Sequence, residues 1–175
     1  MNTEPRVLVF TGDGKGKTTA ALGMALRASG HGMRTLVIQF CKADSSTGEI
    51  DAIEQLAGCE ILQSGLGWIP EPSRPEFKKH QEAAQEGLKK AQTAVQSGDY
   101  DLIVLDEISL AVRESILEEN QVLQLIGNAP SDLCLVLTGR DAPQSFCDAA
   151  DTVTKMQCIK HGLHTGRKAQ EGVEK

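Results

Sequence analysis

Residues 7–23, VLVFTGDGKGKTTAALG, constrain the fold more than any other part of the chain. An apolar run enters a glycine-rich loop, and a run of small, helix-forming residues leaves it. Phosphate-binding loops have the pattern G-x-x-x-x-G-K-[ST], in which glycines turn backbone N–H groups toward phosphate oxygens at a helix N-terminus. Gly16, Lys17 and Thr18 supply the last three letters, but Thr11 stands where the first glycine is expected. The segment therefore predicts a nucleotide-binding loop of an altered kind.

Strand and helix patterns alternate along the chain. Short apolar runs predict strands at 6–11, 34–40, 60–63, 100–107, 131–140 and 151–157, and helical patterns fall at 17–29, 48–57, 75–98 and 117–129. Apolar runs joined by helices are typical of a parallel sheet covered on both faces. Because we find no repeat and no linker, we expect residues 1–175 to form a single-domain α/β fold. It would be of the P-loop (RecA-like) type, with a mostly parallel central sheet and helices on both faces.

Composition limits the function classes. The net charge of −6 argues against broad nucleic-acid binding. The five cysteines form no C-x-x-C pair and no cluster with zinc spacing, which fits a reducing compartment. No run of about 18 apolar residues occurs that would suggest a membrane span. We expect a cytoplasmic protein with neither a nucleic-acid nor a membrane partner.

The loop supplies most of the expected nucleotide contacts. The residues predicted to bind nucleotide are Gly12, Asp13, Gly14, Lys15, Gly16, Lys17, Thr18 and Thr19. Lys17 is placed to contact phosphates, and the Thr18 hydroxyl to bind Mg²⁺ or Mn²⁺. Arg27 lies further along the same helix, where it reaches either the nucleotide or solvent.

Two further strand ends carry polar groups. The run LIVLDE ends in Asp106 and Glu107 and resembles a Walker B strand, which would set a carboxylate beside the loop. Glu107 is the expected metal ligand together with Thr18, and Asp106 is either a ligand or a support for one. The run VLTGR ends at Arg140, which either contacts the triphosphate or makes a surface salt bridge. Lys17, Glu107 and Arg140 are the predicted catalytic residues.

The tryptophan lies in an unusual loop, SGLGWIPEP, at residues 64–72. Trp68 is flanked by glycines and prolines and belongs to no periodic apolar stripe. It either packs on the core as a loop anchor or stacks on a flat, apolar ligand.

Taken in order, these motifs resemble the P-loop type of ATP:corrinoid adenosyltransferase. The resemblance includes the segments TGDGKGKTTAALGMALRASGHG, LVIQFCK, GLGW, LIVLDE, VLTGR, ADTVTKM and KHGLHTGRKAQEGVE, and so covers most of the chain. It implies that the triphosphate of ATP is held as a leaving group while cobalt(I) of a reduced corrinoid attacks the ribose 5′-carbon. The loop would then activate neither water nor a hydroxyl.

The same resemblance implies further contacts and partners. Trp68 and Leu66 would face the corrinoid, although the family often has phenylalanine where this chain has Leu66. The polar segment 160–175 would fold over the site and complete it. A flavoprotein or other reductase and a second copy of the chain, as a homodimer, are the expected protein partners.

Two alternatives follow from the residues alone. A small P-loop kinase or NTPase that transfers or hydrolyses the γ-phosphate would use the same loop and strand. A corrinoid carrier or a regulatory nucleotide-binding module would bind without turnover, but the D-x-H-x-x-G pattern of a carrier that ligates cobalt through histidine is not found.

Overall fold

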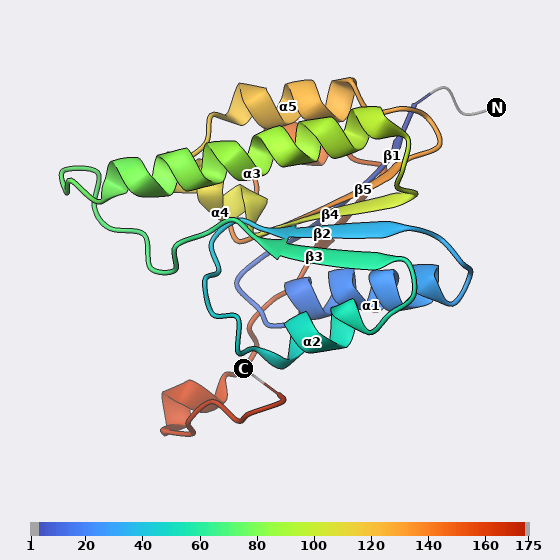
Figure 1. Ribbon diagram of the computed structural model, residues 1–175. Coiled ribbons are helices and arrows are strands. Elements are labelled where there is room, and N and C mark those ends of the chain that lie inside the picture. Colours follow the sequence, from blue (N-terminus) through green and yellow to red (C-terminus); the bar gives the residue numbers. More distant parts are fainter. Residues whose placement is uncertain (1–3, 174–175) are drawn as a thin grey trace.

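One six-stranded sheet, parallel throughout, organises the molecule (Figure 1). The computed structural model describes residues 4–173, so Lys175 and its neighbour, the end of the segment predicted to complete the site, lie outside the described residues. The strands are β1 (Arg6–Thr11), β2 (Thr35–Gln39), β3 (Cys59–Gln63), β4 (Leu102–Asp106), β5 (Cys134–Thr138) and β6 (Thr152–Lys155), in the spatial order β3-β2-β4-β5-β1-β6. The predicted α/β fold with a parallel sheet is confirmed.

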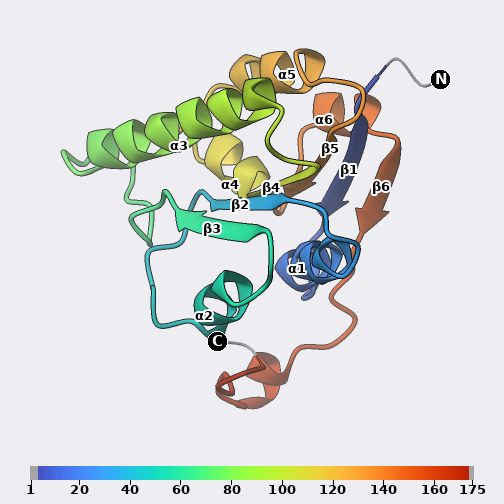
Figure 2. The same ribbon diagram turned by 45° about the vertical axis from the view of Figure 1, so that its right-hand side comes forward.

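Helices cover both faces of this sheet (Figure 2). The helices are α1 (Lys17–Ser29), α2 (Gly48–Glu54), α3 (Phe77–Ser97), α4 (Ile108–Arg113), α5 (Glu119–Gly127) and α6 (Gln144–Asp148), followed by a 3-10 turn, η1 (Gly162–Thr165). α1 and α2 lie on one face, and α3, α4 and α5 on the other. Among the described residues, no helix combines the length and the apolar character needed to cross a bilayer.

Side chains along β1 alternate between the two faces of the sheet. Val7 and Val9 pack into the larger apolar cluster, which includes Leu88 of α3. Phe10 points to the opposite cluster, beside Ala21 of α1. Because both faces of the central strands are buried, their sequences read as unbroken apolar runs.

The sequence patterns do not predict the helices α4 and α6. Each is short, and α6 is fixed mainly by the fully buried Phe146. A helix of one or two turns shows no clear 3.6-residue periodicity, so pattern alone does not reveal it. The predicted strands at 100–107 and 131–140 are also longer than β4 and β5, because their first residues lie in irregular or turn backbone and their last residues lie beyond the strand ends.

The carboxyl ends of β1, β2, β4 and β5 meet at one edge of the sheet. Parallel order brings the loop after β1 beside the last residues of β4 and β5. In open α/β sheets ligands bind at this edge, outside the strand ends.

Candidate functional site

The glycine loop closes around the ammonium group of Lys17. Gly16, with φ of 115°, precedes α1, and Lys17 is the first residue of that helix. Lys17 Nζ donates to the carbonyls of Gly12 (2.8 Å) and Gly14 (2.7 Å), and the residue as a whole is 7% exposed. Burial is the main reason that the pKa of Lys17 is lowered, while nearby Glu107 acts in the opposite direction. A cation is thus held where a phosphate-binding loop needs one.

Thr11 has a structural role at the start of the loop. Its hydroxyl accepts a hydrogen bond from the Ala142 N–H (3.1 Å), which ties the loop to the segment after β5. Gly12 follows with φ of 98°, and a Cβ there would collide with the Met156 carbonyl. A hydroxyl therefore replaces the usual first glycine, while the next position requires glycine.

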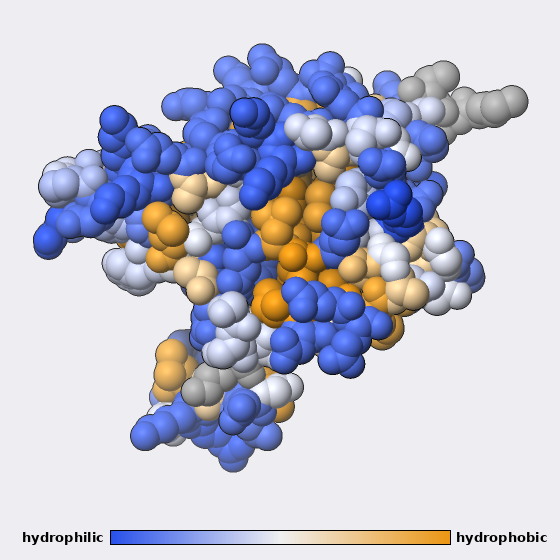
Figure 3. All heavy atoms as spheres, viewed as in Figure 1, coloured by the Kyte–Doolittle hydropathy of each residue, from blue (hydrophilic) through white to orange (hydrophobic). Residues whose placement is uncertain are grey.

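The chain after β6 crosses the loop. Hydrogen bonds join the two: Gly14 N–H to the Met156 carbonyl (2.9 Å), Cys158 N–H to Asp13 Oδ1 (3.3 Å) and Lys15 Nζ to the Val173 carbonyl (2.7 Å). In the space-filling view the terminal segment stands out from the body of the molecule, and a notch separates the two (Figure 3). Through the Lys15 bond, the terminal segment contacts the loop.

Asp106 is saturated with donors. It is fully buried, and its Oδ1 accepts from the hydroxyls of Thr18 (2.9 Å) and Thr138 (2.7 Å). Its Oδ2 accepts from Gln39 Nε2 (3.2 Å) and pairs with Lys42 Nζ (3.3 Å). Both oxygens of Asp106 are therefore engaged by protein groups, one of which is the Thr18 hydroxyl.

Glu107 has the opposite environment. It lies at the start of α4 with φ of 60°, and its N–H donates to Thr138 Oγ1 (2.9 Å). Burial, and after it the charge of Asp106, raises the pKa of Glu107 although Lys17 lies nearby. Within residues 4–173 its carboxylate takes no hydrogen bond or ion pair, so it is available to a cation.

These groups fit a cation that arrives with a triphosphate. Residues 4–173 contain no group of three or more His, Cys, Asp or Glu side chains able to hold a metal. The Thr18 hydroxyl donates a hydrogen bond to Asp106, which leaves the lone pairs of its oxygen for a ligand role, and Glu107 adds one carboxylate. Mg²⁺ is commonly bound in this way, with phosphate oxygens and water completing its shell.

The two arginines differ in position. Arg140 follows the end of β5 and is close enough to influence the pKa values of Lys17 and Glu107. Arg27 is exposed in the last turn of α1, about 15 Å along the helix axis from Lys17. The structure therefore brings Arg140 to the loop and leaves Arg27 away from it. Thr19 is exposed on the first turn of α1.

A pocket of about 910 Å³ opens at the same edge of the sheet, and its lining includes Lys42, which pairs with Asp106. Its lining residues come from the segments after β2 and β3 and from α4: Cys41, Lys42, Ala43, Asp44, Thr47, Gly67, Trp68, Ile69, Leu110, Arg113 and Glu114. Trp68 is 90% exposed, so it is not an anchor buried in the core. Burial, followed by the charges of Glu107 and Asp106, raises the pKa of Cys41 to about 12, which keeps this thiol protonated and unreactive.

Leu66 does not line this pocket. Its spacing from Trp68 predicts that the two side chains lie together, because residues two apart share one side of an extended segment. Gly67, between them, has φ of 84°, so the segment is not extended there. Leu66 is half exposed, outside the pocket wall.

Sequence reasoning missed Gln39, Thr138 and Lys42. All three lie at or just beyond strand ends, where they contact Asp106. The signal in the sequence that could have found them is a polar residue in or just after an otherwise apolar run. The apolar pattern assigns Thr138 and Gln39 to strands and Lys42 to the loop that follows one.

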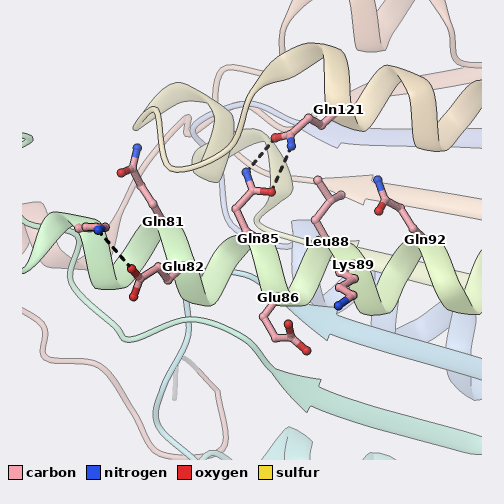
Figure 4. A pocket seen from close by; sticks show the side chains of 9 residues that line it. Gln81, Glu82, Gln85, Glu86, Leu88, Lys89, Gln92 and Gln121 are labelled. Atoms are coloured by element: carbon pink, nitrogen blue, oxygen red, sulfur yellow. Dashed lines mark hydrogen bonds and ion pairs between the residues drawn. The ribbon is translucent and has the colours of Figure 1, made fainter.

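A second hollow, of about 540 Å³, lies on α3 away from the sheet edge (Figure 4). Its walls are mostly polar, and the amides of Gln85 and Gln121 donate to each other there (2.9 and 3.1 Å). This amide pair joins α3 to α5 and has a structural role.

The chain is similar to known proteins in sequence and in fold. The family model of the ATP:corrinoid adenosyltransferases BtuR/CobO/CobP matches residues 3–174. A corrinoid adenosyltransferase of Pseudomonas aeruginosa is 37% identical over 171 residues, which is 96% of this chain and 82% of that protein. One from Escherichia coli K12 is 33% identical over 170 residues, covering 96% and 84%. A KaiC-like protein of Pyrococcus horikoshii has a similar fold, with a TM-score of 0.50 and 16% identity over 90% of this chain and 74% of its own.

Proposed function

The chain belongs to the ATP:corrinoid adenosyltransferase family, and from this premise we propose how its residues perform the reaction. The 5′-deoxyadenosyl group of ATP moves to cobalt(I) of a reduced corrinoid, and tripolyphosphate leaves. The product serves adenosylcobalamin synthesis or salvage. The observation that carries the proposal is the meeting of the Lys17 loop and the Trp68 pocket at one sheet edge.

The loop neutralises the leaving triphosphate. Lys17, Lys15 and Arg140 supply positive charge, and the loop N–H groups from Gly12 to Thr19 supply hydrogen bonds. Lys17 exchanges the Gly12 and Gly14 carbonyls for phosphate oxygens when ATP binds. Mg²⁺ or Mn²⁺, held by Thr18 and Glu107, would add further charge stabilisation to the triphosphate. The nucleophile is the substrate's cobalt, so the protein needs no general base.

The pocket places the corrinoid beside the 5′-carbon. Trp68 presents a broad apolar surface, which favours loss of the axial ligand below cobalt and so helps to form cobalt(I). In-line placement of cobalt and carbon then supplies the orientation that the transfer requires. Leu66 contributes to the same loop from outside the pocket wall.

Further parts of the proposal concern the terminal segment and the partners. The bond from Lys15 Nζ to the Val173 carbonyl supports a role for residues 160–175 in completing the site. The family resemblance supports a flavoprotein or other reductase as electron donor and a homodimer as the assembly. All five cysteines are free, which supports a cytoplasmic location.

Adenosyl transfer should release intact tripolyphosphate. A reaction of the protein with ATP, Mg²⁺ and chemically reduced cob(I)alamin should give a phosphorus NMR spectrum of tripolyphosphate in step with the change in corrin absorbance. If ADP and orthophosphate form in step with that change, the kinase or ATPase alternative is correct. Binding of both substrates without any turnover would instead indicate a carrier or regulatory module.

Trp68→Ala should reduce the four-coordinate fraction of cob(II)alamin bound beside ATP. Losing contact with on the order of 60 Å² of apolar surface is worth about 1.5 kcal/mol, or roughly tenfold in the coordination equilibrium. Leu66→Phe should change this fraction less, because Leu66 lies outside the pocket wall. Magnetic circular dichroism measures the fraction directly.

Cobinamide provides the control for this experiment, because it lacks the dimethylbenzimidazole ligand. With cobinamide the effect of Trp68→Ala should be small. An unchanged cob(II)alamin spectrum in Trp68→Ala would show that this side chain does not act on the axial ligand.

A further inference from the structure

Lys42 lies between the glycine loop and the Trp68 pocket, and the proposed reaction assigns it no role. It follows β2, and its ammonium group is 3.3 Å from Asp106 Oδ2 and 3.1 Å from Glu49 Oε1 of α2. All three side chains are largely buried, at 29% exposed for Lys42, 22% for Glu49 and 0% for Asp106. Lys42 also forms part of the pocket wall that contains Trp68.

The contacts of Asp106 show what this ammonium group does. Oδ1 accepts hydrogen bonds from the hydroxyls of Thr18 and Thr138, so the orientation of Thr18 depends on how the Asp106 carboxylate is rotated. Oδ2 has Gln39 and Lys42 as its partners, and Gln39 is itself held by Gln63 (3.0 Å). Without Lys42 the second oxygen would keep a single neutral donor and gain a free lone pair.

The charges around Lys42 also support a role in holding Asp106. Lys42 pairs with the carboxylates of Asp106 and Glu49, and its charge also acts on Glu107. Burial alone lowers the pKa of Lys42, but attraction from Asp106 and Glu49 outweighs burial, so the pKa is raised and the side chain stays charged. A divalent cation would otherwise find an anionic site there without any nucleotide.

We propose that Lys42 is a positioning residue that holds Asp106 as the acceptor for Thr18 and keeps Asp106 from ligating the cation itself. The cation then binds only together with the triphosphate, through Thr18 and Glu107. This inference rests on the proposed function for the role of Thr18 and Glu107 as cation ligands and for its activity measurement. The simpler role, an ion pair that ties α2 to the sheet, predicts no change in metal binding.

Binding of Mn²⁺ to the nucleotide-free protein, followed by EPR, separates the two roles. Lys42→Met keeps the unbranched stem and removes the charge, and it should bind Mn²⁺ more tightly than wild type, on the order of tenfold. Lys42→Arg keeps the charge and should stay near the wild-type affinity. Lys78→Met is the matched control, because Lys78 is exposed on α3 and pairs only weakly with Glu82 (3.9 Å).

A second substitution identifies the new ligand. Adding Asp106→Asn to Lys42→Met should abolish the gain in Mn²⁺ affinity, because the amide is a poorer ligand than the carboxylate. Circular dichroism spectra and thermal unfolding show whether each variant is folded. If folded Lys42→Met has the wild-type Mn²⁺ affinity, the proposal is wrong and Lys42 is only a structural ion pair.

The activity measurement is independent of these results. With Mg·ATP, Lys42→Met should lose about 10- to 100-fold in kcat/KM for adenosylation, and Lys42→Arg should retain most of it. A wild-type value for Lys42→Met would also overturn the proposal. If the wild-type protein itself shows no adenosylation, the proposed function fails, while the Mn²⁺ experiment still decides the role of Lys42.

Discussion

Lys17→Ala should lower kcat/KM for ATP by about 10²–10³, because the variant lacks the buried cation at the head of the phosphate loop. Charge developing on the leaving triphosphate would lose its closest ammonium group, and Lys15 and Arg140 are more exposed and do not replace it. The folded state should survive, since burial opposes the charged form of Lys17 and lowers its pKa. Initial rates of the corrin absorbance change measure the effect.

Lys90→Ala serves as the control for this substitution. Lys90 is exposed on α3, on the face of the sheet opposite α1, so its removal should leave the rate unchanged. Circular dichroism spectra should be the same for both variants and wild type. A folded Lys17→Ala protein with near wild-type kcat/KM would show that the loop lysine does not stabilise the leaving group.

Much of the fold follows from the sequence, because strand burial and helix periodicity leave direct signals. The long helix α3 begins after a proline and ends before Gly98, so both of its limits are visible in the residues. Strand order is not visible in this way. That β4 lies between β2 and β5 depends on packing between segments distant in the chain.

The site is predictable where function imposes a fixed spacing. Gly16, Lys17 and Thr18 are consecutive, and Glu107 directly follows an apolar strand, so their positions along the chain are enough to single them out as candidates. No fixed spacing in the sequence identifies Lys42, because it follows β2 while its partner Asp106 lies at the end of β4. Pairs that form only through tertiary structure leave no local pattern.

The turn at Gly67 shows a second limit. Leu66 and Trp68 look like neighbours on one side of a strand, and that inference assumes extended backbone. The positive φ of Gly67 turns the chain between them, and only Trp68 reaches the pocket. A glycine signals that such a turn is permitted but not that it occurs.

Glu107→Gln should lower adenosylation by about 10²–10³ and at the same time stabilise the nucleotide-free protein at neutral pH. Activity falls because the amide is a poor ligand for the cation that accompanies ATP. Stability rises because burial, and then the charge of Asp106, raises the pKa of Glu107, so the ionised carboxylate is less favourable in the folded than in the unfolded chain. Removing this charge removes that penalty.

The direction in which the stability difference between Glu107→Gln and wild type changes with pH tests this explanation. A carboxyl whose folded pKa is raised adds stability below its unfolded pKa of about 4.3, and this stability is lost as pH rises through the folded value. The stability advantage of Glu107→Gln over wild type should therefore be largest at neutral pH and shrink as the pH falls toward about 4.3. Urea unfolding at several pH values measures it, with Glu86→Gln, an exposed site on α3, expected to show no such trend. If Glu107→Gln is less stable than wild type at neutral pH, the carboxylate has a stabilising partner in solution, and its role as a free metal ligand is wrong.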